Sequence, residues 1–441
     1  MISISHRIEL VPNNKQKTYF RKAFGVSRLA YNWGLAEWKR MYESGEKCGY
    51  ITLNNKFNAI KREQFPFVLE VTKWAPSQAL RNLEKAFKKF FEDLKKGKIA
   101  YPQFKRRHDN QGSFYFTGVK LSEINLNSKA LKNMPHNLKG KYQYLRVPNL
   151  GCVKMTERLR FNGKINSVVI SQEGDRFYAS FSMTITEEEY LRTHPNVATN
   201  KKNRSVGVDL GIKSAMVISD GISIDNPKTL SKYERRIKRV SRALDKRVHA
   251  RTKQQRLSGV KKSNNYRKLS VTLGNLHRRV YNIRRDFTQK STTILTTNYG
   301  RIGMEDLNVS GMVKNHRLAK SISDVSFYEI KRQITYKAAY NGVSVVMADR
   351  FYPSSKTCSA CGYVDKNLKL SQRTYRCPEC GAVIDRDFNA AINLRKLTEQ
   401  KVGAGSSELT PADLTALLCL FERNGIATSK VETGRRQGAS S

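Results

Sequence analysis

The stretch Ser205-Val-Gly-Val-Asp-Leu-Gly-Ile-Lys-Ser214 predicts a buried strand that ends in a carboxylate and a glycine turn. Apolar residues precede Asp209, and Gly211 allows the backbone to bend sharply beside this acid. A second strand begins at Ala215, and Asp220-Gly221 is typical of a hairpin turn. Two roles remain open for Asp209, because it would suit either the cap of a surface turn or a metal ligand.

The whole chain carries a large excess of positive charge. Its 441 residues include 81 Lys and Arg against 37 Asp and Glu, which gives a formal net charge of +44 at pH 7. This excess indicates a polyanionic partner, because each neutralised phosphate releases counterions. A membrane surface is the other common polyanion, but the sequence contains no spanning apolar run, signal peptide or lipidation motif. Nucleic acid is therefore the predicted partner.

Before residue 200, strand patterns enclose a helical region. Residues 1–11 alternate between apolar and polar side chains and predict a half-buried strand. Residues 13–100 predict a small helical domain with one apolar and one basic face, and the basic face favours nucleic-acid contact over simple solvation. Short strands follow to about residue 190. Because the first strand has no other sheet to join, it is expected to complete an antiparallel barrel that the helical domain interrupts.

The segment from Lys232 to Lys290 is strongly basic, with 20 Lys and Arg against three acids. Regularly spaced apolar residues run through it on both sides of a turn-rich centre, which predicts an antiparallel helical hairpin. A solvated coiled coil normally balances its charges, so we favour a surface that follows a nucleic-acid backbone. The tail from residue 402 is rich in Gly, Ser and Thr, and we expect it to be mobile apart from one short helix after Thr410-Pro411.

Four of the seven cysteines form two closely spaced pairs. Cys358-x-x-Cys361 and Cys377-x-x-Cys380 are separated by 15 residues, and a glycine follows each pair. Four thiolates in a tetrahedral array predict one structural zinc ion in a closed site, whereas the alternative is two redox-active or free CxxC turns. The remaining cysteines are scattered, which argues against a disulfide framework and for a reducing compartment.

Acidic residues follow predicted strands at several informative positions. Asp209 ends the first strand, Glu305 ends a later one, and Asp385 and Asp387 begin the last helix. Phosphodiester hydrolysis with two Mg²⁺ ions requires carboxylates that converge from separate elements. Each acid also has an ordinary explanation, since aspartate is a favoured helix cap. That all of these acids have only ordinary roles is less convincing in a chain with a net charge of +44.

Four motifs in this order resemble the TnpB family, proteins of insertion sequences related to the compact type V CRISPR effectors. They are Gly207-Val-Asp-Leu-Gly211, Gly303-Met-Glu-Asp-Leu307, Arg350-Phe-Tyr-Pro-Ser-Ser-Lys-Thr-Cys-Ser-Ala-Cys-Gly362 and Asp385-Arg-Asp-Phe-Asn-Ala-Ala391. The resemblance implies a multidomain α+β fold. An antiparallel wedge barrel with an inserted helical recognition domain would precede an RNase H-like (RuvC) nuclease domain with an inserted zinc-ribbon module.

The resemblance also implies a division of the chain. The expected parts are the first barrel strand (1–12), the helical recognition domain (13–107), the rest of the barrel (108–200), the RuvC core with its basic hairpin at about 228–295 (201–352), the zinc-binding target-nucleic-acid module (353–382), the final RuvC helix (383–400) and a flexible tail (401–441).

Residue roles carry over from the matching motifs. Asp209, Glu305 and Asp387 would be the catalytic carboxylates and hold two Mg²⁺ ions, while Asp385 would cap the helix or support its neighbour. The zinc ligands would be Cys358, Cys361, Cys377 and Cys380. Contacts to the short DNA motif beside the target would come from Lys73, Ser77, Gln78 and Asn82.

The resemblance implies an RNA-guided DNA endonuclease that cuts double-stranded DNA beside a short flanking motif. Its partners would be a guide RNA derived from the transposon, with one protein per guide, and the target DNA, in which base pairing supplies the sequence specificity. It would act in the prokaryotic cytoplasm, associated with the nucleoid when on DNA, and not at a membrane. A non-cleaving RNA- and DNA-binding regulator of transposition is the first alternative, and a strand-joining transposase is the second.

Overall fold

The structure is a computed structural model that describes residues 1–106, 112–122, 143–198, 203–249, 263–369, 371–403 and 409–431. The chain divides into two compact units, Met1–Thr193 and His194–Ser441, which we describe separately as unit 1 and unit 2. Both units combine sheets with helices, so the fold is α+β with more than one domain. None of the described helices has the length and apolar character needed to cross a membrane.

Unit 1 is built on a seven-stranded antiparallel sheet. Its strands are ordered β2 (Ser113–Phe116), β6 (Lys164–Glu173), β7 (Arg176–Ile185), β1 (Ile2–Val11), β5 (Gly151–Met155), β4 (Tyr144–Val147) and β3 (Lys120–Ser122). The N-terminal strand lies between two strands from the far end of the unit, which confirms that it joins the later sheet. Its alternating side chains send every second residue into the core.

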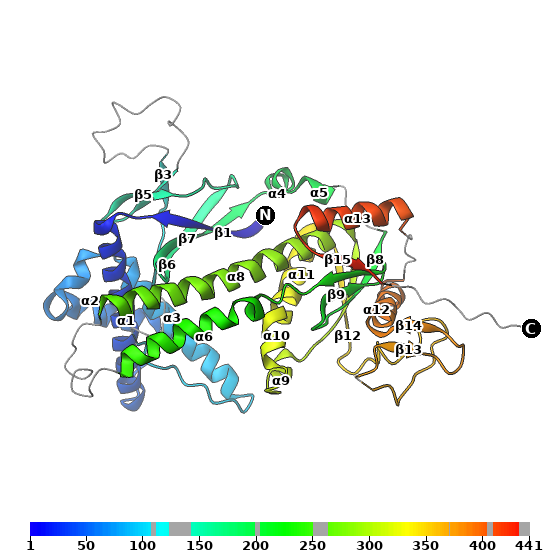
Figure 1. Cartoon of the computed structure of the whole chain (residues 1–441). Helices are drawn as coiled ribbons and strands as arrows, with labels where there is room; N and C mark the ends of the chain where they lie inside the picture. Colours follow the sequence, from blue (N-terminus) through cyan, green and yellow to red (C-terminus); the bar gives the residue numbers. More distant parts are fainter. Residues whose placement is uncertain are drawn as a thin grey trace, which may run out of the picture. The chain divides into compact units, whose positions relative to one another are not determined.

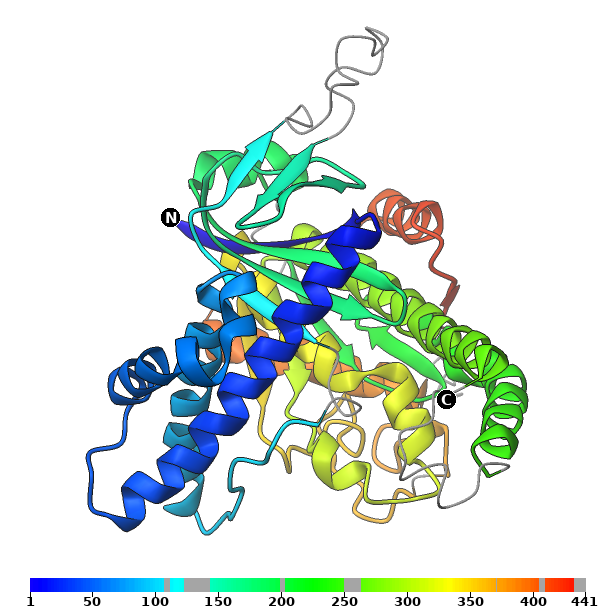
Figure 2. The ribbon, with the colours of Figure 1, turned by 90° about the vertical axis from the view of Figure 1, so that its left-hand side faces the viewer.

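Three long helices cover this sheet. They are α1 (Asn14–Glu43), α2 (Tyr50–Gln64) and α3 (Trp74–Leu94), and Figure 2 shows them side by side. A capping box between Asn13 and Gln16 begins α1, which continues through Gly25 without a break. Phe20 of α1 is buried against Phe177 of β7, with ring centroids 5.4 Å apart. Short helices η1 (Pro66–Glu70) and α4 (Glu187–Thr193) complete the unit.

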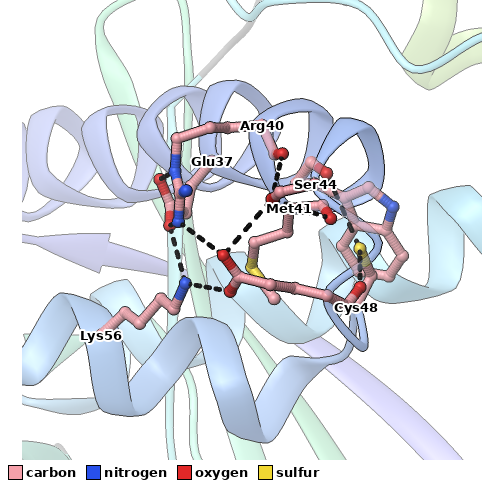
Figure 3. Close-up of polar contacts among 8 residues, drawn as sticks. Glu37, Arg40, Met41, Ser44, Cys48 and Lys56 are labelled. Atoms are coloured by element: carbon pink, nitrogen blue, oxygen red, sulfur yellow. Dashed lines mark hydrogen bonds and ion pairs between the residues drawn. The ribbon is translucent and has the colours of Figure 1, made fainter.

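A polar network ties α2 to the C-terminal end of α1 (Figure 3). The carboxylate of Glu37 accepts hydrogen bonds from Arg40 at 2.7 Å and from Lys56 of α2 at 3.1 Å. Glu46 binds the same lysine at 2.6 Å, and the Ser44 hydroxyl donates to the Arg40 carbonyl at 2.9 Å. These contacts fix the turn between the two helices. The sequence analysis predicted a helical domain here but did not identify α2 as a separate helix.

Unit 2 is built on a mixed six-stranded sheet. Its strands are ordered β12 (Ser344–Ala348), β11 (Arg301–Glu305), β8 (Ser205–Asp209), β9 (Ser214–Ile218), β10 (Ile222–Asp225) and β15 (Thr428–Lys430). The first three strands run parallel, and the others pair antiparallel. The predicted opening strand and hairpin are therefore confirmed as β8 to β10.

Helix α12 (Arg386–Val402) lies directly on the backbone of the two central strands. Gly207 of β8 and Gly303 of β11 are paired across the strands. A Cβ atom added to Gly207 would lie 1.8 Å from the Ala391 carbonyl oxygen, and one added to Gly303 would lie 2.5 Å from the Leu394 carbonyl oxygen. These glycines are required because no side chain fits between the strands and the helix.

The opposite face of the sheet packs against α8 (Asn264–Asn298) and α11 (Phe327–Asn341), whose apolar residues share a core with Val206 and Val208. Helix α6 (Thr229–His249) runs beside α8, as Figure 1 shows, so the described parts of the expected hairpin are two neighbouring helices. The turn-rich centre predicted at residues 258–264 lies mostly outside the described residues. The remaining short helices of this unit are α5 (Pro195–Ala198), α9 (Val309–Met312) and α10 (Ala319–Val325).

The C-terminal segment differs from the expected flexible tail. Helix α13 (Pro411–Arg423) begins at the predicted Thr410 cap, and β15 then pairs with the edge of β10. Leu417, Phe421 and Ile426 are buried in the core of unit 2. The short helix expected after Thr410-Pro411 is confirmed as α13. The expected mobility was wrong for the residues that follow it up to Val431, because a few apolar residues and an open sheet edge outweigh the Gly- and Ser-rich composition around them.

Candidate functional site

Carboxylates gather at one edge of the unit 2 sheet. Strands β8 and β11 are parallel neighbours, and their register pairs Val208 with Met304. The next residues on these strands, Asp209 and Glu305, therefore lie at the same carboxyl-terminal edge. This is the edge at which open sheets with parallel strands commonly bind ligands.

The first turn of α12 contributes two more acids with different surroundings. Asp385 is the helix cap, because its Oδ1 accepts hydrogen bonds from the backbone N–H groups of Asp387 and Phe388 at 3.0 and 2.9 Å. The structure thus confirms the capping role predicted for Asp385. Asp387 lies in the first turn of the helix, where its carboxylate accepts hydrogen bonds from the Arg386 guanidinium at 3.0 and 3.2 Å.

The carboxylates interact electrostatically. Burial raises the pKa of Asp209 well above its usual range, and the negative charges of Glu305 and Asp387 raise this pKa further. A cluster of carboxylates of this kind favours a bound cation, which would reverse the repulsion. Carboxylate oxygens are also the donor type that Mg²⁺ prefers, so these residues suit a magnesium ion by their chemistry.

Three further contacts hold the partner acids of Asp209. Glu305 accepts a hydrogen bond from the hydroxyl of the buried Ser354. Asp387 forms ion pairs with Arg386 at 3.0 Å and with Arg373 at 3.5 Å. Ser354 belongs to a motif that was quoted for the family resemblance, but the sequence alone gave it no role, because it lies 49 residues from the acid it contacts.

The four cysteines form a second potential metal site, in the module that carries β13 (Thr374–Arg376) and β14 (Val383–Asp385). They are the one group of three or more potential ligands in the described ranges whose donor atoms lie within 4.8 Å of one another. The distance from Cys358 Sγ to Cys380 Sγ is 3.7 Å, and that from Cys361 Sγ to Cys377 Sγ is 3.5 Å. A tetrahedral zinc ion with bonds of about 2.3 Å requires sulfurs about 3.8 Å apart, so the cysteines fit it.

The turns around the cysteines have the geometry of metal knuckles. Gly362 and Gly381 adopt φ values of 84° and 67°, as expected for the residue after each pair. Although burial alone would raise it, backbone N–H groups of Cys380 and Glu379 lower the pKa of Cys377 to about 7. A sulfur that deprotonates near neutral pH is prepared to bind a cation.

Two asparagines of α12 attach the cysteine module to the sheet domain. Asn389 donates its amide to the Thr357 carbonyl at 2.6 Å and accepts from the Ser359 backbone N–H at 2.8 Å. One turn later, Asn393 donates to the Ser354 carbonyl at 2.8 Å. Both side chains are buried, and their spacing of four residues places them on one face of the helix. The sequence analysis did not identify them.

The four residues predicted to contact DNA lie at the start of α3 in unit 1, and the structure gives them different surroundings. Lys73 is exposed beside Trp74, while the Ser77 hydroxyl shares a hydrogen bond of 2.7 Å with the hydroxyl of Tyr50. Gln78 donates to Asn82 at 3.1 Å, and these two residues line a cavity of about 230 Å³. Lys73 and Ser77 do not line that cavity.

This cavity in unit 1 combines apolar and polar walls. Its lining residues from the other elements include Phe24, Arg28, Lys105, Phe114 and Tyr115. Asn32 fixes the chain on one side by a pair of hydrogen bonds to the backbone of Lys105, at 2.8 and 3.0 Å. Gly112 has no room for a side chain, because a Cβ there would lie 2.4 Å from the ring of Phe24.

The basic hairpin presents cations outward and apolar residues inward. Val240 of α6 and Leu276 and Val280 of α8 are buried. The first part of α6 exposes Lys232, Arg235, Arg236, Lys238 and Arg239. This distribution fits a surface that contacts phosphates.

Comparison with known proteins identifies three family models along the chain. They are described as "Helix-turn-helix domain" for residues 1–47, "Probable transposase" for residues 181–316 and "Cas12f1-like, TNB domain" for residues 327–394. Residues 1–47 contain a strand and the single long helix α1, not two helices joined by a turn.

Two curated relatives match most of the chain. "Putative RNA-guided DNA endonuclease InsQ" of Escherichia coli K12 is 28% identical over 408 residues, covering 88% of this chain and 90% of the relative. "Putative RNA-guided DNA endonuclease" of Streptomyces pristinaespiralis is 29% identical over 385 residues, covering 87% and 86%.

The fold resembles that of a chain in the cryo-EM structure of a Cas12f1–sgRNA–target DNA complex. The TM-score is 0.50 at 13% sequence identity, over 87% of this chain and 83% of the other. The four sequence motifs, the three family models and these relatives agree. Together they support an assignment to the TnpB family.

Proposed function

We propose that the protein is an RNA-guided, Mg²⁺-dependent DNA endonuclease of an insertion sequence, which cleaves double-stranded DNA beside a short flanking motif with one RuvC-type site. The observation that carries this proposal is the convergence of Asp209, Glu305 and Asp387 in a chain of net charge +44. Both curated relatives are named as RNA-guided DNA endonucleases, which supports the same function here.

The division of the chain is part of the proposal. The sheet of unit 1 would be the wedge barrel, made from residues 1–12 and 108–200, and residues 13–107 would be the recognition domain. Unit 2 would hold the RuvC core in residues 201–352 and 383–400, with the zinc-binding module at residues 353–382. The order of strands β10, β9, β8, β11 and β12 supports an RNase H-like core.

Asp209, Glu305 and Asp387 would hold two Mg²⁺ ions. When bound, these ions would polarise the target phosphate and supply an activated water. The Ser354 hydroxyl orients Glu305, and the cap formed by Asp385 fixes the start of the helix that carries Asp387. Arg386 and Arg373 form ion pairs with Asp387 and offset part of its negative charge next to Asp209.

The four cysteines would hold one structural Zn²⁺ ion. Their site leaves no open position for a substrate, so the ion would stabilise the module and not take part in catalysis. The exposed cations of α6 would contact nucleic-acid phosphates.

The DNA motif beside the target would be contacted by unit 1. Gln78 and Asn82 are the stronger candidates because they line a cavity together with Arg28 and Lys105. Lys73 lies exposed at the start of the same helix, where it can reach a phosphate, and Ser77 supports the site through Tyr50. The guide RNA would derive from the transposon, with one protein per guide, in the cytoplasm of a prokaryote.

One experiment tests the whole proposal. The protein is purified, its co-purifying RNA is sequenced, and a plasmid library with a matching target and randomised flanks is incubated with the complex and Mg²⁺. We expect cleavage of both strands only beside one short motif. Binding without cleavage would instead support a regulator of transposition, and joined DNA ends would support a strand transferase.

A further inference from the structure

Phe351 is the most exposed large apolar side chain in the described part of unit 2, at 87% of its surface. It lies three residues after Ala348, which pairs with Glu305 across β11 and β12. The ring is therefore displayed on the loop that leaves the carboxylate edge of the sheet. An exposed phenyl ring beside these carboxylates is a candidate for contact with a partner.

The loop that displays Phe351 is held in place. Asp349 accepts hydrogen bonds from the backbone N–H groups of Phe351 and Tyr352, at 2.9 and 3.0 Å. A few residues later, Ser354 binds Glu305 through its hydroxyl and Asn393 through its carbonyl. A fixed loop keeps the ring at one position relative to Glu305, so a partner would meet a preorganised surface.

A second exposed aromatic residue is tied to the same edge. Asp306, which directly follows Glu305, forms ion pairs with Lys331 of α11 and with Arg350 at 3.6 Å. Tyr328 is 67% exposed and lies one turn before Lys331, on the same face of the helix. One carboxylate thus links the two elements that carry the exposed rings, and each ring has a cation nearby.

We propose that Phe351, assisted by Tyr328, stacks on unpaired nucleotides of the DNA strand that reaches the carboxylates. This inference rests on the proposed function and adds residues that position the substrate. Stacking on an aromatic ring accepts any base, which suits an enzyme whose sequence specificity comes from a guide. Arg350 and Lys331 would add phosphate contacts, because their pairing with Asp306 leaves both side chains at the surface.

Binding tests the inference without cleavage. The full-length protein with its co-purifying RNA, in EDTA, is titrated with oligodeoxythymidine that contains single 2-aminopurines, whose fluorescence falls on stacking. We expect Phe351→Leu to remove the position-dependent quenching and to weaken binding by about tenfold, as is usual for one lost stacking contact. Phe351→Trp should restore both. Unchanged quenching in Phe351→Leu would overturn the inference, as would loss of the co-purifying RNA.

Cleavage provides the second measurement. Phe351→Leu and Tyr328→Leu should raise the DNA concentration at half-maximal rate by about fivefold or more, with a smaller effect on the rate at saturation. Tyr42→Leu is the control, since Tyr42 is 71% exposed on α1 of unit 1. If the wild-type complex does not cleave matched DNA, the proposed function fails. If it cleaves and Phe351→Leu behaves like the wild type in both assays, only the present inference fails.

Discussion

At the scale of single residues, environment decides which acids can serve as metal ligands. The Asp385 carboxylate accepts hydrogen bonds from two backbone N–H groups, whereas the Asp387 carboxylate interacts with arginine side chains. Asp209 has a raised pKa because burial and two neighbouring carboxylates oppose its ionisation. Two aspartates that look equivalent in the sequence therefore have different interactions in the structure.

Asp209→Asn should abolish cleavage and stabilise the metal-free protein. Folding raises this pKa, so the folded state binds more protons and the ionised carboxylate lowers stability as pH rises above about 4. We expect the Tm in EDTA at pH 8 to rise by a few degrees, and Mg²⁺-dependent cleavage to fall by at least about a hundredfold. Mg²⁺ should raise the Tm of the wild type but not of the variant.

The neighbouring aspartates supply the matched comparison. Asp387→Asn should lose cleavage and the Mg²⁺-dependent gain in Tm, while Asp385→Asn should retain a measurable share of both because asparagine also caps helices. Cleavage by Asp387→Asn together with an inactive Asp385→Asn would show that the third ligand is misassigned.

Lys337 should make stability depend on pH. Its buried ammonium group donates to the Gln289 carbonyl and to the hydroxyls of Thr292 and Thr293, and burial lowers its pKa to about 7. The unfolded chain keeps this proton to about pH 10, so the wild type gains stability between pH 7 and pH 10.

The measurement is the free energy of unfolding of Lys337→Met against that of the wild type. Relative to the wild type, the variant should lose about 2 kcal/mol between pH 7 and pH 9, because only the wild type gains from deprotonation. A difference that stays constant with pH would contradict the lowered pKa.

At the scale of elements, one helix assembles the site. Helix α12 lies on glycines of β8 and β11, presents Asp387 at its first turn and holds the cysteine module through Asn389 and Asn393. The motif glycine two positions before Asp209 is therefore explained by packing, since it admits the helix that carries the partner acid.

Gly207→Ala tests this contact. Its Cβ would lie 1.8 Å from the Ala391 carbonyl oxygen and 2.6 Å from the Arg395 backbone nitrogen, both in a helix that cannot easily move. We expect a loss of about 3 kcal/mol or more in the free energy of unfolding, together with loss of cleavage. The control is Gly25→Ala in α1, where a Cβ meets nothing within 4 Å and helix propensity should add about 0.5–1 kcal/mol. Equal effects at both glycines would refute the packing argument.

At the scale of the whole molecule, charge and topology have separate roles. The net charge of +44 selects the class of partner, while the sheets bring together residues that are far apart in the chain. The C-terminal segment belongs to this larger scale, because α13 and β15 complete the core and the edge of the sheet that begins at residue 205.

A chain that stops after Gly403 should therefore be less stable or aggregate. It would uncover the edge of β10 and the core that Leu417 and Phe421 now fill. We expect a Tm lower by several degrees or loss of the protein to the insoluble fraction, measured by calorimetry and sedimentation. A chain that stops after Val431 keeps β15 and is the control. If the shorter chain melted like this control, the segment would be dispensable for the fold.

The sequence by itself determined the local features of this protein. Alternating and helical periodicities predicted β1, α3, β7 and the basic hairpin, because these patterns depend only on near neighbours. Spacing likewise predicted the cysteine turns. The acids were predicted as candidates from their positions at strand ends and from the family resemblance, and their catalytic role remains a proposal.

The tertiary structure alone decided which distant groups meet. Ser354 reaches Glu305 across 49 residues, and Arg373, just before β13, reaches Asp387 in α12. The C-terminal segment is likewise ordered because β15 pairs with the edge of β10, which is distant in the sequence. Such contacts depend on how chain segments pack in three dimensions, so a local pattern carries no record of them. For the same reason, the sequence allowed Asp209 to be either a turn cap or a metal ligand. The fold shows that it interacts with the carboxylates of Glu305 and Asp387.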